Sequence, residues 1–393
     1  ATLITVNSGG QLYANGGTTF TNNLSLAGNG WSETAGQLGA LRLQSNAVYS
    51  GAVTLAADTR ISAYQSAGSI SGAITGSKNL EFAAGTVTLT SESNAYVATT
   101  VSGGTLQIGN GGATGVLGSG AVTLSNSSIL SFNRAASTTI SNAISGTGSV
   151  AATITGASND LTVSSAMNLT AGTINLASDR DLNVQANLAT TNATSSAIIL
   201  NAGKSTAAGT STGGDIKLTG SPFPTITVGS GGRATLYTGS VSGSTGVTSL
   251  IGSGSGNFRY NSDETTTNYT VALGAGNYAI YREAPTLSAT INNDTKTYNG
   301  LGYSGGSVSN PAGFVNGDTN AQLGAGTYVA TNAINVGTYT ITGSITSGLG
   351  YAVTLSPGTL TVTKADLFLS GTRVYDSGKS FAGQYLTATG AHG

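Results

Sequence analysis

Acidic side chains are the residues of this sequence most suited to chemistry, because paired carboxylates can catalyse acid–base reactions or bind calcium. Asp179 and Asp181 flank Arg180, and in an extended strand both would project to one face. Glycoside hydrolysis needs two carboxylates about 5–9.5 Å apart, and Ca²⁺ sites use oxygen ligands. Asp263 and Glu264 are adjacent and would point apart. We interpret the Asp-Arg-Asp segment as a solvated strand end, with calcium as the alternative, and we expect no catalytic residue.

Composition excludes several other kinds of site. The chain has no cysteine, so it cannot form disulfides, thiolate nucleophiles or Cys-ligated metal centres. Its only histidine is His392, which leaves little from which to build a catalytic triad or a multi-histidine metal site. The net charge of −1 argues against binding of nucleic acid or anionic membrane. We therefore expect no cofactor and no membrane insertion.

Aromatic residues in the N-terminal half are candidate ligand contacts, since tyrosine and tryptophan are enriched at binding surfaces. They are scattered through the sequence and comprise Tyr13, Trp31, Tyr49, Tyr64 and Tyr96. Each taken singly is better interpreted as a core or end-covering residue, and Trp31 as a cover for part of the fold. The sequence names no receptor site.

The elements that must position these residues are predicted to be strands. Only 7% of the residues are charged and 38% are hydrophobic, yet the chain is rich in β-branched residues and has just five prolines. That composition does not match disorder, and it suits an elongated molecule with a thin continuous core.

Short triplets of alternating apolar and polar residues recur through the first two-thirds of the chain, which is the period of a half-buried strand. Helices should be nearly absent, because no window has apolar residues at helical spacing. In the triplet around Gln107, we expect Leu106 to face inward and Gln107 outward. The triplets include Val53-Thr54-Leu55, Leu80-Glu81-Phe82, Val122-Thr123-Leu124, Leu161-Thr162-Val163, Met167-Asn168-Leu169 and Leu182-Asn183-Val184.

The spacing of the triplets favours a β-solenoid over an antiparallel sandwich. Steps of about seven residues, as from Met167 to Ile174, indicate passage from one side of a coil to the next. Steps of 16 to 19, as from Val87 to Leu106 or from Ile198 to Ile216, indicate nearly a full turn. Each turn would bury its inner face only against neighbouring turns.

Residues 86–134 carry the first family resemblance. They contain VSGGTLQIGNGG from Val101 and LGSGAVTL from Leu117. This pattern resembles the repeat of autotransporter passenger domains, which implies turns of a right-handed parallel β-helix. We assign residues 1–250 to this β-helix, and the more aromatic residues 251–284 to its end and an exit segment.

A second resemblance covers the C-terminal part. KTYNG at Lys296–Gly300 recurs as RVYDSG at Arg373–Gly378, and the set is similar to the glycine-rich, mostly-β "Tyr-Asp-Gly" stalk modules of giant bacterial exoproteins. Asn299 stands where the motif has Asp, and Ser377 is interpreted as an insertion before the glycine. We expect one module at residues 285–364 and the start of a truncated second module at 365–393.

Together the two patterns resemble filamentous-haemagglutinin-like exoproteins, which are secreted by a two-partner route. This resemblance implies an extracellular or cell-surface adhesin that attaches to host cells, surfaces or biofilm matrix through an unknown polysaccharide or protein receptor. Because the chain starts without signal-peptide features, we expect it to be a segment of a longer protein.

Two other functions stay open on the sequence alone. Subunits could join end to end into a matrix fibre, since strand edges at the ends of a solenoid promote pairing. A polysaccharide-active β-helix enzyme is the remote alternative, because its groove would need clustered charges and the charged residues here are spread thinly.

Overall fold

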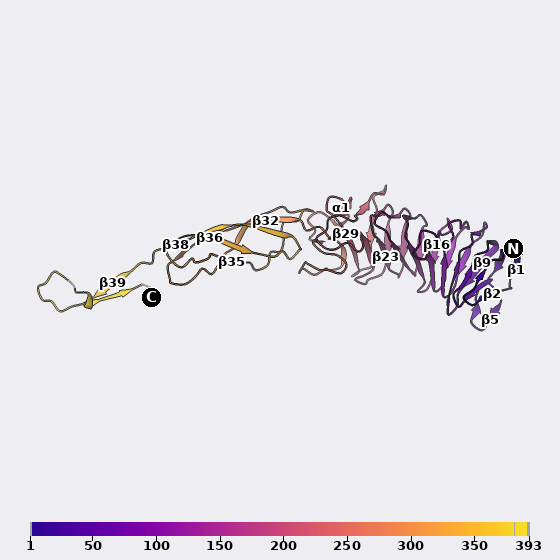
Figure 1. The fold of residues 1–393 in the computed structure, drawn as a ribbon, viewed down its shortest axis with the longest axis horizontal. Coiled ribbons are helices and arrows are strands. Elements are labelled where there is room, and N and C mark those ends of the chain that lie inside the picture. Colours follow the sequence, from indigo (N-terminus) through magenta and orange to yellow (C-terminus); the bar gives the residue numbers. More distant parts are fainter. Residues whose placement is uncertain (1, 381, 391–393) are drawn as a thin grey trace. The chain divides into compact units, whose positions relative to one another are not determined.

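The computed structural model describes residues 2–380 and 382–390 and is almost entirely β. The described chain divides between Ala284 and Pro285 into compact units (Figure 1). Helices in the described residues are short, namely α1 (Val247–Ile251) and the 3-10 helix η1 (Gly383–Tyr385). The expected all-β class is therefore confirmed.

The N-terminal unit is a parallel β-helix whose strands stack coil upon coil (Figure 1). Its first sheet takes one short strand from most coils, and neighbouring strands pair in parallel. In sheet order these strands are β1 (Ile4–Val6), β4 (Leu24–Gly28), β9 (Val53–Ser62), β12 (Leu80–Phe82), β14 (Thr99–Val101), β16 (Val122–Leu124), β19 (Ile144–Gly146), β22 (Met167–Leu169), β25 (Leu188–Thr190) and β28 (Ile226–Thr227). Strands β2 (Leu12–Asn15), β7 (Leu41–Gln44) and β11 (Ile74–Thr75) pair beside this path.

The second sheet lies on another side of the same coils. In sheet order it contains β3 (Thr19–Phe20), β8 (Ala47–Tyr49), β10 (Ala67–Ile70), β13 (Thr86–Leu89), β15 (Thr105–Ile108), β17 (Ile129–Arg134), β20 (Ser149–Ile154), β23 (Ile174–Ser178), β26 (Ile198–Ala202), β29 (Arg233–Thr238), β31 (Gly276–Tyr281) and β30 (Phe258–Arg259). A third sheet adds a further side to the later coils. It is built from β18 (Thr138–Ile140), β21 (Leu161–Val163), β24 (Leu182–Val184) and β27 (Ile216–Leu218).

The core is a set of apolar ladders that run from coil to coil. Alternation turns the outer residues of each triplet inward, as in β16 and β22, where the flanking residues are buried and the middle one is exposed. Burial of a leucine or isoleucine side chain stabilises the fold by roughly 1.5–3 kcal/mol, and each coil depends on its neighbours for that burial. One ladder of fully buried register partners is Leu106, Leu130, Val150, Ile174 and Ile198.

The repeat length differs in part from the sequence interpretation. Val87 and Leu106 are register partners, so that step of 19 is one coil, and the step from Val122 to Ile144 is also one coil. The step from Met167 to Ile174 does cross between sides of one coil. By contrast, the step from Ile198 to Ile216 crosses from the second sheet to the third and is not a full turn. The third sheet was not foreseen, which is why this step was misjudged.

Buried arginines hold the last coils of the β-helix together. Arg282 is fully buried, and its Nη1 and Nη2 donate hydrogen bonds to the carbonyl oxygens of Ala202 (2.5 Å) and Gly214 (2.7 Å). Arg259 is 1% exposed and donates to several backbone carbonyls, including that of Val271. Both arginines use backbone oxygens as partners; Arg282 joins segments far apart in the sequence, and Arg259 holds its own neighbourhood together.

The C-terminal unit forms its core from strands of mixed direction. In β32 (Thr286–Ile291), one edge pairs antiparallel with β34 (Val308–Ala312) and the other pairs parallel with β37 (Ala352–Ser356). The companion sheet has the order β33 (Asp294–Thr297), β38 (Gly358–Thr363), β36 (Gly337–Ser344) and β35 (Thr327–Val329). The small buried core comprises Ile291, Ala330, Ala333, Ile341, Leu360 and Val362.

The two Tyr-Asn/Asp motifs of this unit form the same kind of turn. Asn299 Oδ1 accepts a hydrogen bond from the N–H of Leu301, and Asp376 Oδ1 accepts one from the N–H of Gly378. The residue after each acceptor is left-handed, with φ +72° at Gly300 and +61° at Ser377. Ser377 therefore replaces the first glycine of the turn, and its interpretation as an insertion was wrong. The second motif lies between β39 (Phe368–Gly371) and β40 (Leu386–Thr389), which pair antiparallel.

Candidate functional site

The acidic residues weighed as calcium or catalytic candidates join neighbouring coils. Asp181 Oδ1 accepts the backbone N–H of Asp215 at 2.9 Å, and Asp181 Oδ2 accepts Lys217 Nζ at 2.5 Å. Asp179 Oδ2 accepts the N–H of Gly156 at 2.8 Å. The carboxylate oxygens thus face donors of adjacent coils.

Asp181 belongs to an aspartate ladder that the sequence reading did not identify. The backbone N–H of Asp181 donates to Asp160 Oδ1 (3.1 Å), that of Asp215 to Asp181, and that of Ser240 to Asp215 Oδ1 (2.7 Å). A hydrogen bond from Arg180 is the main cause that lowers the pKa of Asp160. The available signal was an aspartate directly before the triplets that begin at residues 161, 182 and 216.

The remaining chemical candidates do not assemble into a site. Asp263 Oδ1 accepts the N–H groups of Thr265 and Thr266, which caps its own turn, and Glu264 Oε1 accepts the N–H of Ser205 at 3.3 Å. Among residues 2–380 and 382–390, no group of three or more His, Cys, Asp or Glu side chains is placed to hold a metal ion. His392 lies outside the described residues.

The five aromatic candidates separate into core and surface residues. Tyr49 and Tyr96 are buried, and burial raises the pKa of both phenols. Tyr64 is half-buried. Tyr13 is 47% exposed and Trp31 is 55% exposed, so both lie at the surface, and the covering role of Trp31 stays a prediction.

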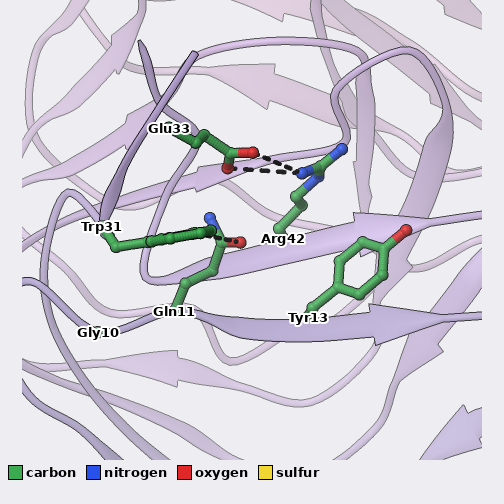
Figure 2. A pocket seen from close by; sticks show the side chains of 6 residues that line it. All are labelled: Gly10, Gln11, Tyr13, Trp31, Glu33 and Arg42. Atoms are coloured by element: carbon green, nitrogen blue, oxygen red, sulfur yellow. Dashed lines mark hydrogen bonds and ion pairs between the residues drawn. The ribbon is translucent and has the colours of Figure 1, made fainter. Parts of the chain in front are cut away.

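Tyr13 and Trp31 line the same hollow of about 530 Å³ on the β-helix (Figure 2). Tyr13 on β2 and Arg42 on β7 are register partners in adjacent parallel strands, and the middle position of each apolar triplet turns them outward. Trp31 and Glu33 belong to a hairpin of β5 (Ser32–Glu33) and β6 (Gly36–Gln37), which the chain forms between β4 and β7. Gln11, directly before β2, completes the side-chain lining.

Hydrogen bonds and ring contacts hold the lining side chains in place. Trp31 Nε1 donates to Gln11 Oε1 at 3.3 Å, and Gln11 Nε2 donates to the carbonyl of Gly39 at 3.1 Å. Arg42 Nη1 lies 3.2 Å and 3.5 Å from the two Glu33 carboxylate oxygens. The Arg42 guanidinium carbon lies 5.1 Å from the centre of the Tyr13 ring, within cation–π range.

The hairpin that carries Trp31 is itself fastened to the coils. Gln37 Nε2 donates to the carbonyl of Gly30 at 3.2 Å, and Arg60 Nη1 donates to the carbonyl of Gln37 at 2.7 Å. Arg60 also pairs with Glu81 at 3.0 Å. The hollow therefore has a prearranged wall of aromatic and planar polar side chains, which suits recognition of a ligand.

Sequence reasoning found the aromatic residues of this hollow and missed the polar ones. Gln11, Glu33 and Arg42 carry no motif, and they meet only because β2, β7 and the hairpin pack together. The middle position of Leu41-Arg42-Leu43 was the signal that could have placed Arg42 on the outer surface.

A second surface feature is an uncharged row along the first sheet. Register partners in successive coils place Thr123, Ser145 and Asn168 in line, and all three are exposed. Arg60 and Glu81 precede this row along the same line of register partners and pair with each other at 3.0 Å. This row presents hydroxyl and amide groups without net charge.

Comparisons with known proteins recognise part of the C-terminal unit. Neither the curated proteins nor the solved structures contain a match to this chain. In the described residues, no helix has the length and apolar character needed to span a membrane. Residues 281–361 match the family described as MBG domain (YGX type), a repeat-type domain of surface and secreted proteins, which confirms the resemblance of this region to glycine-rich, mostly-β stalk modules.

Proposed function

We propose that this chain is a non-enzymatic segment of a secreted bacterial surface adhesin. The β-helix presents the attachment surface, and the MBG-type module serves as a stalk repeat. Attachment is to a cell, a surface or a biofilm matrix, with a polysaccharide or protein receptor. Secretion by a two-partner route belongs to the same proposal and rests on the sequence resemblance to filamentous-haemagglutinin-like exoproteins.

The observation that carries this proposal is the uncharged outer row of the β-helix. Thr100, Thr123, Ser145 and Asn168 follow one another in register, so the surface repeats hydrogen-bonding groups at the spacing of the coils. A repeated weak contact gains strength by multivalency, because each further contact forms within an already bound molecule. A binding surface of this kind needs no catalytic centre.

The MBG-type module supports the placement at a cell surface. Its matched residues lie almost wholly within the C-terminal unit, which begins at Pro285. Domains of this type are repeats of surface proteins, and a repeat unit that folds around its own small core is suited to spacing a binding region from an anchor.

Electron microscopy distinguishes attachment from fibre formation. The purified chain is imaged by negative stain over an approximately hundredfold concentration series, since mass action favours assembly at high concentration. Discrete particles at every concentration are expected. Fibres that lengthen with concentration would contradict the adhesin proposal and favour a self-assembling matrix subunit.

A further inference from the structure

The hollow beside Trp31 has one flat apolar wall that no part of the described chain covers. The Trp31 side chain is 55% exposed, and its indole N–H is bound to Gln11, which fixes the ring by its edge. Figure 2 shows Trp31 and Tyr13 on either side of Gln11. An exposed indole held in one orientation offers contact area at little further cost in side-chain entropy.

The polar groups at the hollow are planar and have unused hydrogen-bonding capacity. Within the described residues, Arg42 Nη2 has no hydrogen-bond partner, and the Glu33 carboxylate accepts only from Arg42 Nη1. Gln11 Nε2 has one hydrogen on Gly39 and a second hydrogen to donate. Donors and acceptors of this kind can bind adjacent hydroxyl groups in pairs.

The charge of the hollow favours a neutral ligand. Arg42 and Glu33 neutralise one another at 3.2 Å, and their side chains are 18% and 20% exposed. An anion at Arg42 would lie beside the like charge of Glu33, and a cation at Glu33 would lie beside the like charge of Arg42. A neutral ligand that has both an apolar face and many hydroxyl groups avoids both repulsions.

We propose that this hollow is a binding site for an uncharged saccharide. The apolar face of a pyranose ring stacks on Trp31, and its hydroxyl groups bind Gln11, Glu33 and Arg42. The site deepens the proposed adhesin function, on which its biological meaning rests, by giving the attachment surface a ligand class.

Trp31 is the only tryptophan of the chain, so its fluorescence reports on this hollow directly. The full chain is titrated with methyl glycosides and short neutral oligosaccharides of glucose, galactose, N-acetylglucosamine and N-acetylgalactosamine. Phosphocholine and a sulfated disaccharide serve as the charged rivals. We expect a saturable change of emission with at least one neutral sugar, at a Kd of about 1 mM, and none with the charged probes.

Variants that keep the reporter locate the contact. Glu33→Gln removes a proposed hydroxyl partner, and Tyr13→Ala removes the ring against which Arg42 is held. Each should weaken the fluorescence-detected affinity about tenfold, which corresponds to about 1.4 kcal/mol. The matched control is Phe223→Ala, since Phe223 is an aromatic residue 43% exposed in the same unit and does not line the hollow. Circular dichroism melts of all variants show whether the fold is intact.

The outcomes of these experiments decide between the saccharide site and its alternatives. No emission change with any neutral sugar, a change with a charged probe alone, or equal affinity in Glu33→Gln and wild type would overturn the saccharide assignment. Retention of chain-coated beads on cells is measured in parallel. Beads that attach without any sugar response would support the adhesin proposal and reject this site. Sugar binding without attachment of the beads would support this site and reject the adhesin proposal.

Discussion

The β-helix and the MBG-type module solve the problem of burying a small apolar content in opposite ways. In the β-helix, strands pair with the strand one coil later, as Val122 does with Ile144. In the module, β32 pairs with β37, so that Thr286 lies opposite Ala352. The first arrangement spreads a continuous ladder along the chain, whereas the second gathers a small local core. The comparison shows that contacts between successive coils can stabilise a β-helix that has a large outer surface and few charged residues.

The largest effect should come from a charge placed in the β-helix ladder. Leu106 is fully buried between Val87 and Leu130, so Leu106→Asp should lower the free energy of unfolding by about 4 kcal/mol. Gln107→Ala, at the outward neighbour, should cost less than about 1 kcal/mol. Circular dichroism melts measure both changes. An unchanged melt for Leu106→Asp would show that this residue does not face the core.

A glycine substitution tests how closely the coils approach. A Cβ at Gly172 would overlap the carbonyl of Gly148 in the preceding coil, so Gly172→Ala should destabilise the β-helix by about 2–3 kcal/mol. In the module, a Cβ at Gly302 meets no atom within 4 Å, so Gly302→Ala should change stability by less than about 0.5 kcal/mol. Hydrogen exchange by mass spectrometry follows each unit separately. Equal effects at both positions would contradict the difference in packing.

Acid should weaken the aspartate ladder of the β-helix. Since the hydrogen bond from Arg180 lowers the folded-state pKa of Asp160, its contribution is present above the usual aspartate pKa and is lost as pH falls through the lowered value. Asp160→Asn should cost about 1 kcal/mol near pH 7. This cost should shrink as pH falls through the lowered pKa of Asp160, because the wild-type carboxylate then becomes protonated. A cost that is independent of pH in chemical denaturation would assign the effect to packing.

Alkali should act on a tyrosine of the module with a smaller effect. Desolvation and the hydrogen bond to Asp294 raise the pKa of Tyr303 to about 12. The folded state favours the neutral phenol, so this contribution is present below pH about 10 and is lost as pH rises towards about 12. The ¹³Cζ chemical shift of Tyr303 measures its titration by NMR. In Asp294→Asn the pKa should fall towards its usual value, and an unchanged pKa would mean that Asp294 has no part in the shift.

The same contrast explains what the sequence could predict. Triplets such as Leu161–Val163 and Leu182–Val184 coincide with β21 and β24 because their partners recur at regular intervals. The third sheet was missed, since triplet spacing alone does not tell one side of a coil from another. Arg42 and Glu33 meet because the chain forms a hairpin between β4 and β7, and no repeat in the sequence marks that hairpin. Contacts of this kind could not be predicted, because the spacing of the triplets does not determine them.

Attachment of beads coated with full-length variants tests the central claim most directly. One variant carries Thr123→Asp and Asn168→Asp in the outer row of the β-helix, and the matched control carries Thr338→Asp and Thr340→Asp at exposed positions of β36. Adhesion to cells and to matrix-coated surfaces should fall for the β-helix variant and stay at the wild-type level for the control. Equal adhesion by all three proteins, or loss only in the control, would contradict attachment through the uncharged row of the β-helix.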